Sequence, residues 1–392
     1  MNLEGIDIFH RDYGLGNVIS HGESYITIKF EKEDSPLCIS NKDLLEDVKI
    51  LNINTELEAY IFEELGSMYA IDPEGVKNNL HNDYETCLKY LGTYFPRSYI
   101  ESYNIFSNLL SNYHIRDTFK YKDSIDILDF GSGSGGNVFG LIDALENGLI
   151  LDDMKIRIYC VDGNRSMLAI LDKIFHKIYK KLNIELTTIE KEFRGREDFE
   201  TEAENIIRRY QKKYDIITSF KFVSEFYNAD YNKNSGMYRA IAEVGYNNLK
   251  EKGLIVIEDI TTPIHNSSDL QSISGDSFIP ALMKEEIVFL ARKNKSIANI
   301  LPVTGYFLCD QCTRNECFTQ VTYNIKGRFP QNISKVTYRV LTSKEFADEL
   351  FKYIEQKPVY RVSPGNSCPY EAYRNHPSGE EPANYPDGFE LK

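Results

Sequence analysis

Two aspartates and a glycine-dense turn are the residues of this chain best suited to bind a ligand. The apolar run 125–130 contains Asp129 and continues directly into Gly131-Ser132-Gly133-Ser134-Gly135-Gly136. Glycine lets the backbone approach a ligand closely and adopt positive φ, and the unpaired N–H groups at a helix start favour anionic or hydrogen-bond-accepting groups. A strand, a glycine turn and a helix start in this order predict a nucleotide-type ligand at 131–136.

Asp162 ends the next apolar run, where a carboxylate can accept both hydroxyl groups of a ribose. NAD is one candidate ligand, because Gly136 occupies the third position of Gly-x-Gly-x-x-Gly. Two features favour S-adenosylmethionine instead. Asp129 stands two residues before the first glycine, where it can reach an amino group of the ligand, and no second nucleotide-binding half follows.

The segment 125–300 alternates between strand and helix patterns. Apolar strands are predicted at 125–130, 156–161, 184–189, 214–219 and 253–258, with helices near 136–147, 165–181, 201–212 and 236–249. Near-continuous apolar strands separated by amphipathic helices predict an α/β fold, a doubly wound parallel sheet covered on both faces. Ligands of such sheets bind outside the carboxyl ends of the strands, where the aspartates and glycines stand.

The pattern Asp129-x-Gly131-x-Gly133-x-Gly135 followed by Asp162 resembles the class I S-adenosylmethionine-dependent methyltransferases. The resemblance implies a Rossmann-like sheet of seven strands with a terminal antiparallel hairpin. It also implies that these five residues contact the methyl donor. Asn164 and Ser219, at the ends of the second and fourth predicted strands, are expected to join them.

The segment after the fourth strand is where acceptor-facing residues of that family lie, and its polar candidates are Lys221 and Glu225. Either could serve in acid–base chemistry or positioning, or could be a solvated charge or a salt-bridge partner. The Asn/Asp-Pro-Pro-aromatic tetrad of many DNA amino-methylating enzymes is missing here. A catalytic cysteine of the C5-methylpyrimidine type is missing as well.

Several motifs read together resemble the methyltransferase-like family that assembles the mitochondrial small ribosomal subunit. They are Phe95-Pro96-Arg97-Ser98-Tyr99, Ser219-Phe220, Ser224-Glu225-Phe226, Ile257-Glu258-Asp259, Thr262-Pro263, the cysteines described next and the strand 336–341. This resemblance implies an acceptor that is RNA or a ribosome-associated target. Tyr94 and Asp259-Ile260 depart from the family pattern.

Three thiols lie within nine residues, at Cys309, Cys312 and Cys317. Cys-x2-Cys brings two thiolates to one metal ion, and a closed site needs a fourth ligand, for which Cys368 is the first choice, ahead of His376 or His265. Zinc or an iron–sulfur cluster would fit such a ligand set, and the resembling family implies a cluster. The alternative is three free thiols.

The flanking segments predict further domains. Residues 1–50 alternate as short antiparallel strands and predict a small SH3/Tudor-like barrel that resembles the modules of CarD-type regulators, which implies docking to RNA polymerase or another protein; a structural cap is the alternative. Residues 51–120 predict helices over 56–69, 83–91 and 99–113, with a break at Tyr94-Phe95-Pro96 and Ser98 as N-cap. This segment is expected to cover the cofactor cleft. The methyltransferase domain spans 121–350, with the cysteine insertion at 309–317, and 351–392 is a proline-rich tail.

Composition limits the partners of this chain of 392 residues. Its net charge of −14 opposes sequence-independent adhesion to nucleic acid. No apolar stretch is long enough to span a membrane and the N-terminus lacks signal-peptide features, so a cytoplasmic location is expected. A basic face at Lys173, Lys177, Lys180 and Lys181 is either a solvated helix surface or a phosphate contact. The whole chain could also be a non-catalytic binding or assembly factor that retains the methyltransferase fold and docks through the barrel and the cysteines.

Overall fold

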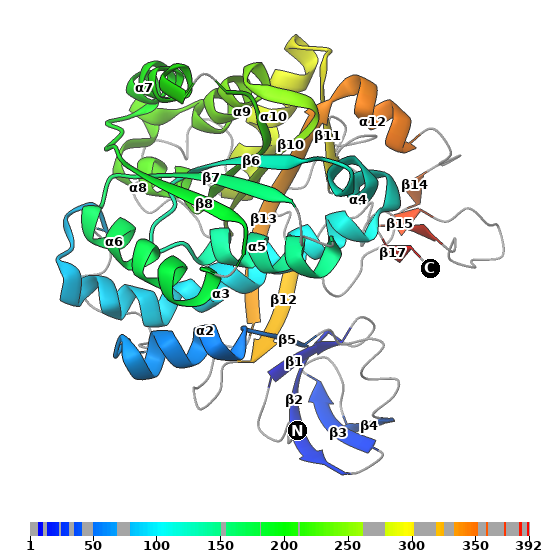
Figure 1. The fold of residues 1–392 in the computed structure, drawn as a ribbon. Helices are drawn as coiled ribbons and strands as arrows, with labels where there is room; N and C mark the ends of the chain where they lie inside the picture. The colour runs from blue at the N-terminus through cyan, green and yellow to red at the C-terminus, as the bar shows by residue number, and fades with distance from the viewer. Residues whose placement is uncertain are drawn as a thin grey trace.

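Figure 1 shows the chain as a computed structural model. The structure describes residues 7–10, 14–22, 25–30, 35–40, 50–68, 79–149, 154–180, 182–210, 212–261, 279–301, 319–324 and 333–351, and four two-residue strands beyond residue 357. The cysteines at 309, 312, 317 and 368 lie outside these residues, as do His265 and His376. Within the described chain, no helix is long and apolar enough to cross a membrane.

A mixed sheet of nine strands forms the centre of the molecule, in the order β5-β12-β13-β10-β9-β6-β7-β8 with β11 also paired to β13. Strands β8, β7, β6, β9 and β10 pair in parallel, and β13 is antiparallel to β10. The bounds are β5 Ile50–Asn52, β6 Ser124–Phe130, β7 Lys155–Asp162, β8 Ile184–Glu190, β9 Tyr214–Phe220, β10 Leu249–Ile260, β11 Ile297–Leu301, β12 Thr319–Asn324 and β13 Ile333–Ser343. The predicted doubly wound sheet is confirmed.

The edge beyond β13 differs from the single hairpin that the sequence predicts. Strand β12 pairs with the first half of β13 and β11 with its second half, so two strands share the seventh position. Strand β5, which precedes the helical segment, then pairs in parallel with β12. The resemblance could not show this extension, because the pairing joins segments far apart in the chain.

Helices cover both faces of the sheet (Figure 1). Helices α5 (Gly136–Gly148) and α6 (Arg165–Ile174), which continues as the π-helix η3 (Phe175–Tyr179), pack on one face with α4 (Tyr113–Lys120) and α12 (Lys344–Phe351). Helices α7 (Arg196–Tyr210), α8 (Val223–Asn234), α9 (Met237–Asn247) and α10 (Ile279–Lys293) pack on the other. Two separate apolar cores result, one on each face, as expected for strands buried on both sides.

Helix α3 (Tyr84–Ser111) runs unbroken through Pro96, so the predicted break and the predicted N-cap at Ser98 are wrong. A proline inside a helix costs about 3 kcal/mol. Helix α3 packs closely on α5 just after the proline, since a Cβ on Gly140 would lie only 2.2 Å from the Tyr99 carbonyl oxygen. The backbones of α3 and α5 therefore touch, and the flanking aromatic rings of Phe95 and Tyr99 are buried.

The N-terminal segment forms a separate four-stranded antiparallel sheet, lower right in Figure 1. Its strands are β1 (Asp7–His10), β2 (Gly14–His21), β3 (Tyr25–Phe30) and β4 (Leu37–Ser40). Alternate residues of β3 are buried, which confirms the period-two pattern. Its likeness to a Tudor module stays a prediction. The helix predicted over 56–69 is shorter: α2 (Thr55–Ala59) continues as the π-helix η1 (Tyr60–Glu64) and ends there.

Candidate functional site

The glycine turn joins β6 to α5 at the carboxyl edge of the parallel strands. Gly131, Gly133 and Gly135 have φ of 76°, 50° and 88°, the left-handed region that favours glycine. A Cβ at Gly133 would meet no atom within 4 Å, whereas one at Gly131 would lie 2.6 Å from Phe222. Gly133 therefore faces open space, and the N-terminus of α5 beside it receives no side-chain cap.

Asp162 ends β7 and turns its carboxylate onto the glycine turn. The Gly133 N–H donates to Asp162 Oδ2 at 2.8 Å, and the Asn164 N–H donates to Oδ1 at 2.7 Å. Burial raises the pKa of Asp162 above its ordinary value, against these two hydrogen bonds. Each oxygen keeps a second lone pair, so the carboxylate is oriented and can still accept ligand hydroxyl groups.

Asp129 lies at the point where the strand order reverses, between β6 and β9, which is where open α/β sheets bind ligands. Its Oδ1 accepts hydrogen bonds from Asn137 Nδ2 at 2.7 Å and from Thr218 Oγ1 at 2.6 Å. Its Oδ2 is buried without a hydrogen-bond partner among the described residues. Burial raises the pKa of Asp129 to about 6. Such a carboxylate lacks a positive partner.

Asn164 and Ser219, the two remaining residues predicted to contact the donor, differ in their hydrogen bonds. The Asn164 side chain caps α6 by accepting the N–H groups of Ser166 and Met167, and its amide also donates to the Asn82 carbonyl. These bonds give Asn164 a structural role. The Ser219 hydroxyl is buried near the end of β9 with no partner in the described part of the chain; Ser219 pairs in register with Phe130, so its side chain lies on the opposite face of the sheet from Asp129.

Lys221 follows β9 with φ of 53°, a strained conformation for a residue with a side chain. Its ammonium lies 2.5 Å from Glu101 Oε2 of α3 and donates to Ser98 Oγ at 3.3 Å. Ser98 in turn lies against Gly136 at the start of α5. Helix α3 therefore contacts the carboxyl edge and links Lys221 to the glycine turn; that its segment covers the cofactor cleft stays a prediction.

Glu225 occupies the first turn of α8 and is exposed. Its charge contributes to raising the pKa of Tyr90 on α3, as does Asp162, although burial is the main cause. Tyr90 therefore lies within electrostatic reach of Asp162 at the end of β7 and of Glu225 at the start of α8. Sequence reasoning assigned the aromatic residues of this segment to the core and did not place Tyr90 at the site.

Two buried glutamates at the same edge were also missed. Glu101 is 1% exposed and pairs with Lys221, and its Oε1 accepts the Ser334 hydroxyl of β13. Glu258, at the end of β10, is also 1% exposed. The Ile257-Glu258-Asp259 motif was available as a signal for Glu258. Glu101 offered none, because its partner is distant in sequence.

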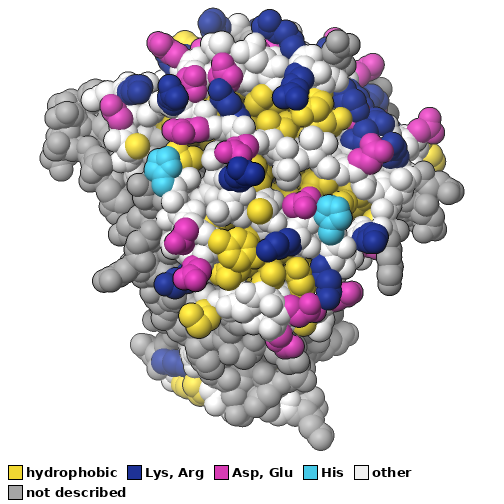
Figure 2. Space-filling view, turned by 60° about the vertical axis from the view of Figure 1, so that its left-hand side comes forward, with side chains coloured by type: hydrophobic (Ala, Val, Ile, Leu, Met, Phe, Trp, Pro, Cys, Tyr) yellow, Lys and Arg dark blue, Asp and Glu magenta, His cyan; other side chains and the backbone are white. Residues whose placement is uncertain are grey.

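Two of the four lysines of the predicted basic face contact neighbouring helices, and Lys181 lies outside the described residues. Lys173 donates to the Tyr84 hydroxyl at 2.9 Å, and Lys177 pairs with Glu64 at 2.8 Å. On the part of the surface that is described, Figure 2 shows basic and acidic side chains interspersed. The predicted phosphate contact at these lysines therefore gains no support.

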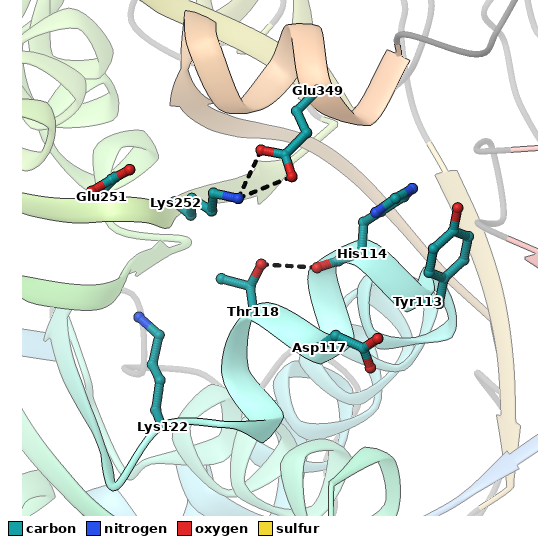
Figure 3. Close-up of a pocket in the computed structure, with 8 residues that line it drawn as sticks. All are labelled: Tyr113, His114, Asp117, Thr118, Lys122, Glu251, Lys252 and Glu349. Atoms are coloured by element: carbon teal, nitrogen blue, oxygen red, sulfur yellow. Dashed lines mark hydrogen bonds and ion pairs between the residues drawn. The ribbon is translucent and has the colours of Figure 1, made fainter.

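A shallow hollow of about 500 Å³ opens at the opposite, amino edge of the strands (Figure 3). Lys252 and Glu349 face each other across it with Nζ and Oε2 2.7 Å apart, and Thr118 donates to the His114 carbonyl. In the described chain, no group of three or more His, Cys, Asp or Glu side chains could hold a metal ion; the predicted cysteine site lies outside it and stays a prediction.

No family model and no curated protein matches the chain. Among solved structures it is similar to a precorrin-6y C5,15-methyltransferase from Geobacter metallireducens, with 16% identity over 59% of this chain and 85% of that one and a TM-score of 0.32. It is also similar to loganic acid methyltransferase with SAH (9% identity, 62% and 94%, TM-score 0.35). A putative class I S-adenosylmethionine-dependent methyltransferase from Listeria monocytogenes is a third (12% identity, 78% and 82%, TM-score 0.33). With identities of 16% or less, these similarities concern the fold alone.

Proposed function

We propose that this chain is an S-adenosylmethionine-dependent methyltransferase whose donor binds at the carboxyl edge between β6, β7 and β9. The observation that carries the proposal is Asp129, a fully buried carboxylate with an unpartnered oxygen and no cation, next to a glycine turn that faces open space. Burying a carboxylate in this way is costly unless a positive or hydrogen-bond-donating partner arrives. The donor has both an amino group and a sulfonium.

The residues at this edge fit the parts of the donor. Asp129 would accept its amino group, Asp162 would accept the ribose hydroxyls, and the backbone around Gly133 leaves room for close approach. Bound there, the donor supplies an already activated methyl group. The chain then needs to align the acceptor and exclude water, which suits a site covered by α3.

The resemblance of the motifs supports RNA or a ribosome-associated target as the acceptor, in a cytoplasmic protein. In this proposal Lys221 and Glu225 flank the acceptor side, Lys221 from the buried pair with Glu101 and Glu225 from the exposed start of α8. The N-terminal sheet would dock to RNA polymerase or another protein, and the cysteines would hold zinc or an iron–sulfur cluster. Metal analysis of anaerobically purified protein tests the last point.

Calorimetric titration with S-adenosylmethionine tests the donor site. Gly133→Arg fills the open space and should abolish binding, and Asp162→Ala should weaken it at least 10-fold by removing the ribose acceptor. Gly66→Arg is the matched control, because Gly66 also has positive φ, 69°, and open space around its Cα but lies at the end of η1. Equal binding by the Gly133 and Gly66 variants would remove the site assignment.

A non-catalytic binding factor would bind a partner without transferring a methyl group. Incubation of labelled donor with an extract of cells lacking this protein separates the two. A labelled product that forms with the wild type and is lost with Asp162→Ala supports the enzyme.

A further inference from the structure

Glu258 differs from the other buried carboxylates of the sheet. It is 1% exposed, yet neither carboxylate oxygen accepts a hydrogen bond from any described residue. Its neighbour Asp259 accepts bonds from the Ser224 N–H, the Ile260 N–H and the Tyr238 hydroxyl. Buried polar groups are normally satisfied, so an orphaned carboxyl group needs an explanation.

The position of Glu258 places it on the acceptor side of the proposed donor site. The Lys221 N–H donates to the Glu258 carbonyl at 2.9 Å, so the two residues are adjacent at the ends of β9 and β10. Glu258 pairs in register with Tyr338 of β13 and shares the sheet face of Val256, which is the face that α3 and α5 cover. Lys221 therefore lies between Glu258 and the glycine turn.

The charged groups around Glu258 are of both signs. Lys221, directly after β9, is paired with Glu101 of α3; its charge lowers the pKa of Glu258, whereas the charges of Glu101 and Asp259 raise it, and Arg97 of α3 acts on Lys221. Burial is the main cause of this raised pKa, which lies well above the ordinary value of a glutamate. A carboxylate with a raised pKa is a stronger base near neutral pH.

We propose that Glu258 accepts the proton of an aliphatic amine of the lysine type on a basic protein, which is the methyl acceptor. The proposal rests on the proposed function and narrows it. The acceptor ammonium passes one proton to the Glu258 carboxylate, and the freed nitrogen lone pair forms a bond to the methyl carbon of the sulfonium donor. The carbon–sulfur bond breaks, its electron pair stays on sulfur as a thioether, and the methylated nitrogen keeps the positive charge.

Charge complementarity favours a protein over RNA. The chain has a net charge of −14, the lysines at 173 and 177 are engaged, and the positive charge that moves from sulfur to nitrogen stays near acidic groups.

The test incubates wild-type protein with methyl-labelled S-adenosylmethionine and an extract of cells lacking this protein, then separates RNA from protein and hydrolyses both. The expected result is label in N-methyl-lysine. Label in RNA, label in base-labile methyl esters, or donor binding with no labelled product would each overturn the inference. These three contradicting outcomes would leave donor binding in calorimetry intact, whereas failure of the proposed function would abolish that binding as well.

Glu258→Gln should lower the methylation rate about 100-fold near pH 7, because the amide cannot accept the proton, and this deficit should shrink as pH rises toward the amine's own pKa of about 10. Donor binding should change less than 2-fold. Glu258→Asp should retain the pH-dependent rise at a lower rate, and Glu251→Gln at the amino edge is the matched control. Unchanged rate and pH profile in Glu258→Gln would overturn the inference.

The raised pKa of Glu258 also predicts an effect on folding stability that can be measured without turnover. Between the unfolded and folded pKa of Glu258 the folded protein binds more protons, so its stability falls as pH rises through that window. Glu258→Gln should therefore gain stability over the wild type with increasing pH, and the two should converge at acidic pH. A difference independent of pH would contradict the assigned titration.

Discussion

Strand β6 has two buried aspartates three positions apart, and they have opposite surroundings. At the amino edge, Asp126 contacts Arg157 at 2.6 Å, Lys250 at 2.6 Å and Lys212 at 3.2 Å. At the carboxyl edge, Asp129 has only neutral hydrogen-bond donors in the described chain. Both are nearly inaccessible, at 3% and 0%.

The pKa values of the two residues move apart accordingly. Burial alone would raise the pKa of Asp126, but hydrogen bonds from Arg157 and Lys250 hold it well below the ordinary range. Burial raises the pKa of Asp129 to about 6. The amino edge is an ion network complete in itself, which also includes Asp215 with Lys122 and Lys250. At the carboxyl edge, Asp129 Oδ2 has no hydrogen-bond partner among the described residues, and the proposed donor would supply one.

The largest effect is expected at Lys221. Lys221→Met should destabilise the protein by about 3–5 kcal/mol, because Glu101 would remain buried without its cation. Urea unfolding of Lys221→Met and of the double variant Lys221→Met/Glu101→Gln measures this, and the double variant should recover more than half of the loss. A loss below about 1 kcal/mol in the single variant would show that the pair is not buried as described.

Asn substitutions of the two aspartates should act in opposite directions. Asp126→Asn should cost about 2–3 kcal/mol at pH 7, less than a fully buried pair because its cations are a quarter to a third exposed. That contribution is present above the unfolded pKa of about 4 and is lost at lower pH. Asp129→Asn should be neutral or stabilising at pH 7, because its raised pKa makes the wild type lose stability as pH rises from about 4 to 6.

Unfolding free energies of both variants between pH 4 and 8 check this contrast. Destabilisation of similar size by both substitutions at pH 7 would mean that Asp129 is as well compensated as Asp126.

The smallest effect concerns backbone strain. Lys221 and Lys252 both have φ near +55°, at 53° and 58°, but at opposite edges of the sheet. Lys252→Gly relieves about 1 kcal/mol of strain and loses a half-exposed ion pair with Glu349 worth less, so it should stabilise slightly. Lys221→Gly relieves the same strain but exposes the unpaired Glu101, and should destabilise. A shift of the midpoint temperature of thermal unfolding in the same direction for both variants would contradict the comparison.

The sequence predicted what depends on local pattern. Strand β6 was expected over 125–130 and spans Ser124–Phe130, because a strand buried on both faces is a near-continuous apolar run. The break predicted at Pro96 was wrong, since a local rule does not include tertiary contacts such as the close approach of Gly140 to the Tyr99 carbonyl oxygen. The role of Glu101 could not be predicted for a similar reason, because its partner Lys221 comes from another part of the chain.

Calorimetry of S-adenosylmethionine binding at pH 6, in buffers of different ionisation enthalpy, tests the central claim most directly. A cation bound beside Asp129 lowers the pKa of this carboxyl group. Since a group with a pKa of about 6 is half protonated at pH 6, the wild type should release about half a proton more on binding than Asp129→Asn. The variant should also bind more weakly, by about 10-fold. Equal proton release and equal affinity in the two proteins would contradict the assignment of Asp129 as the donor's partner.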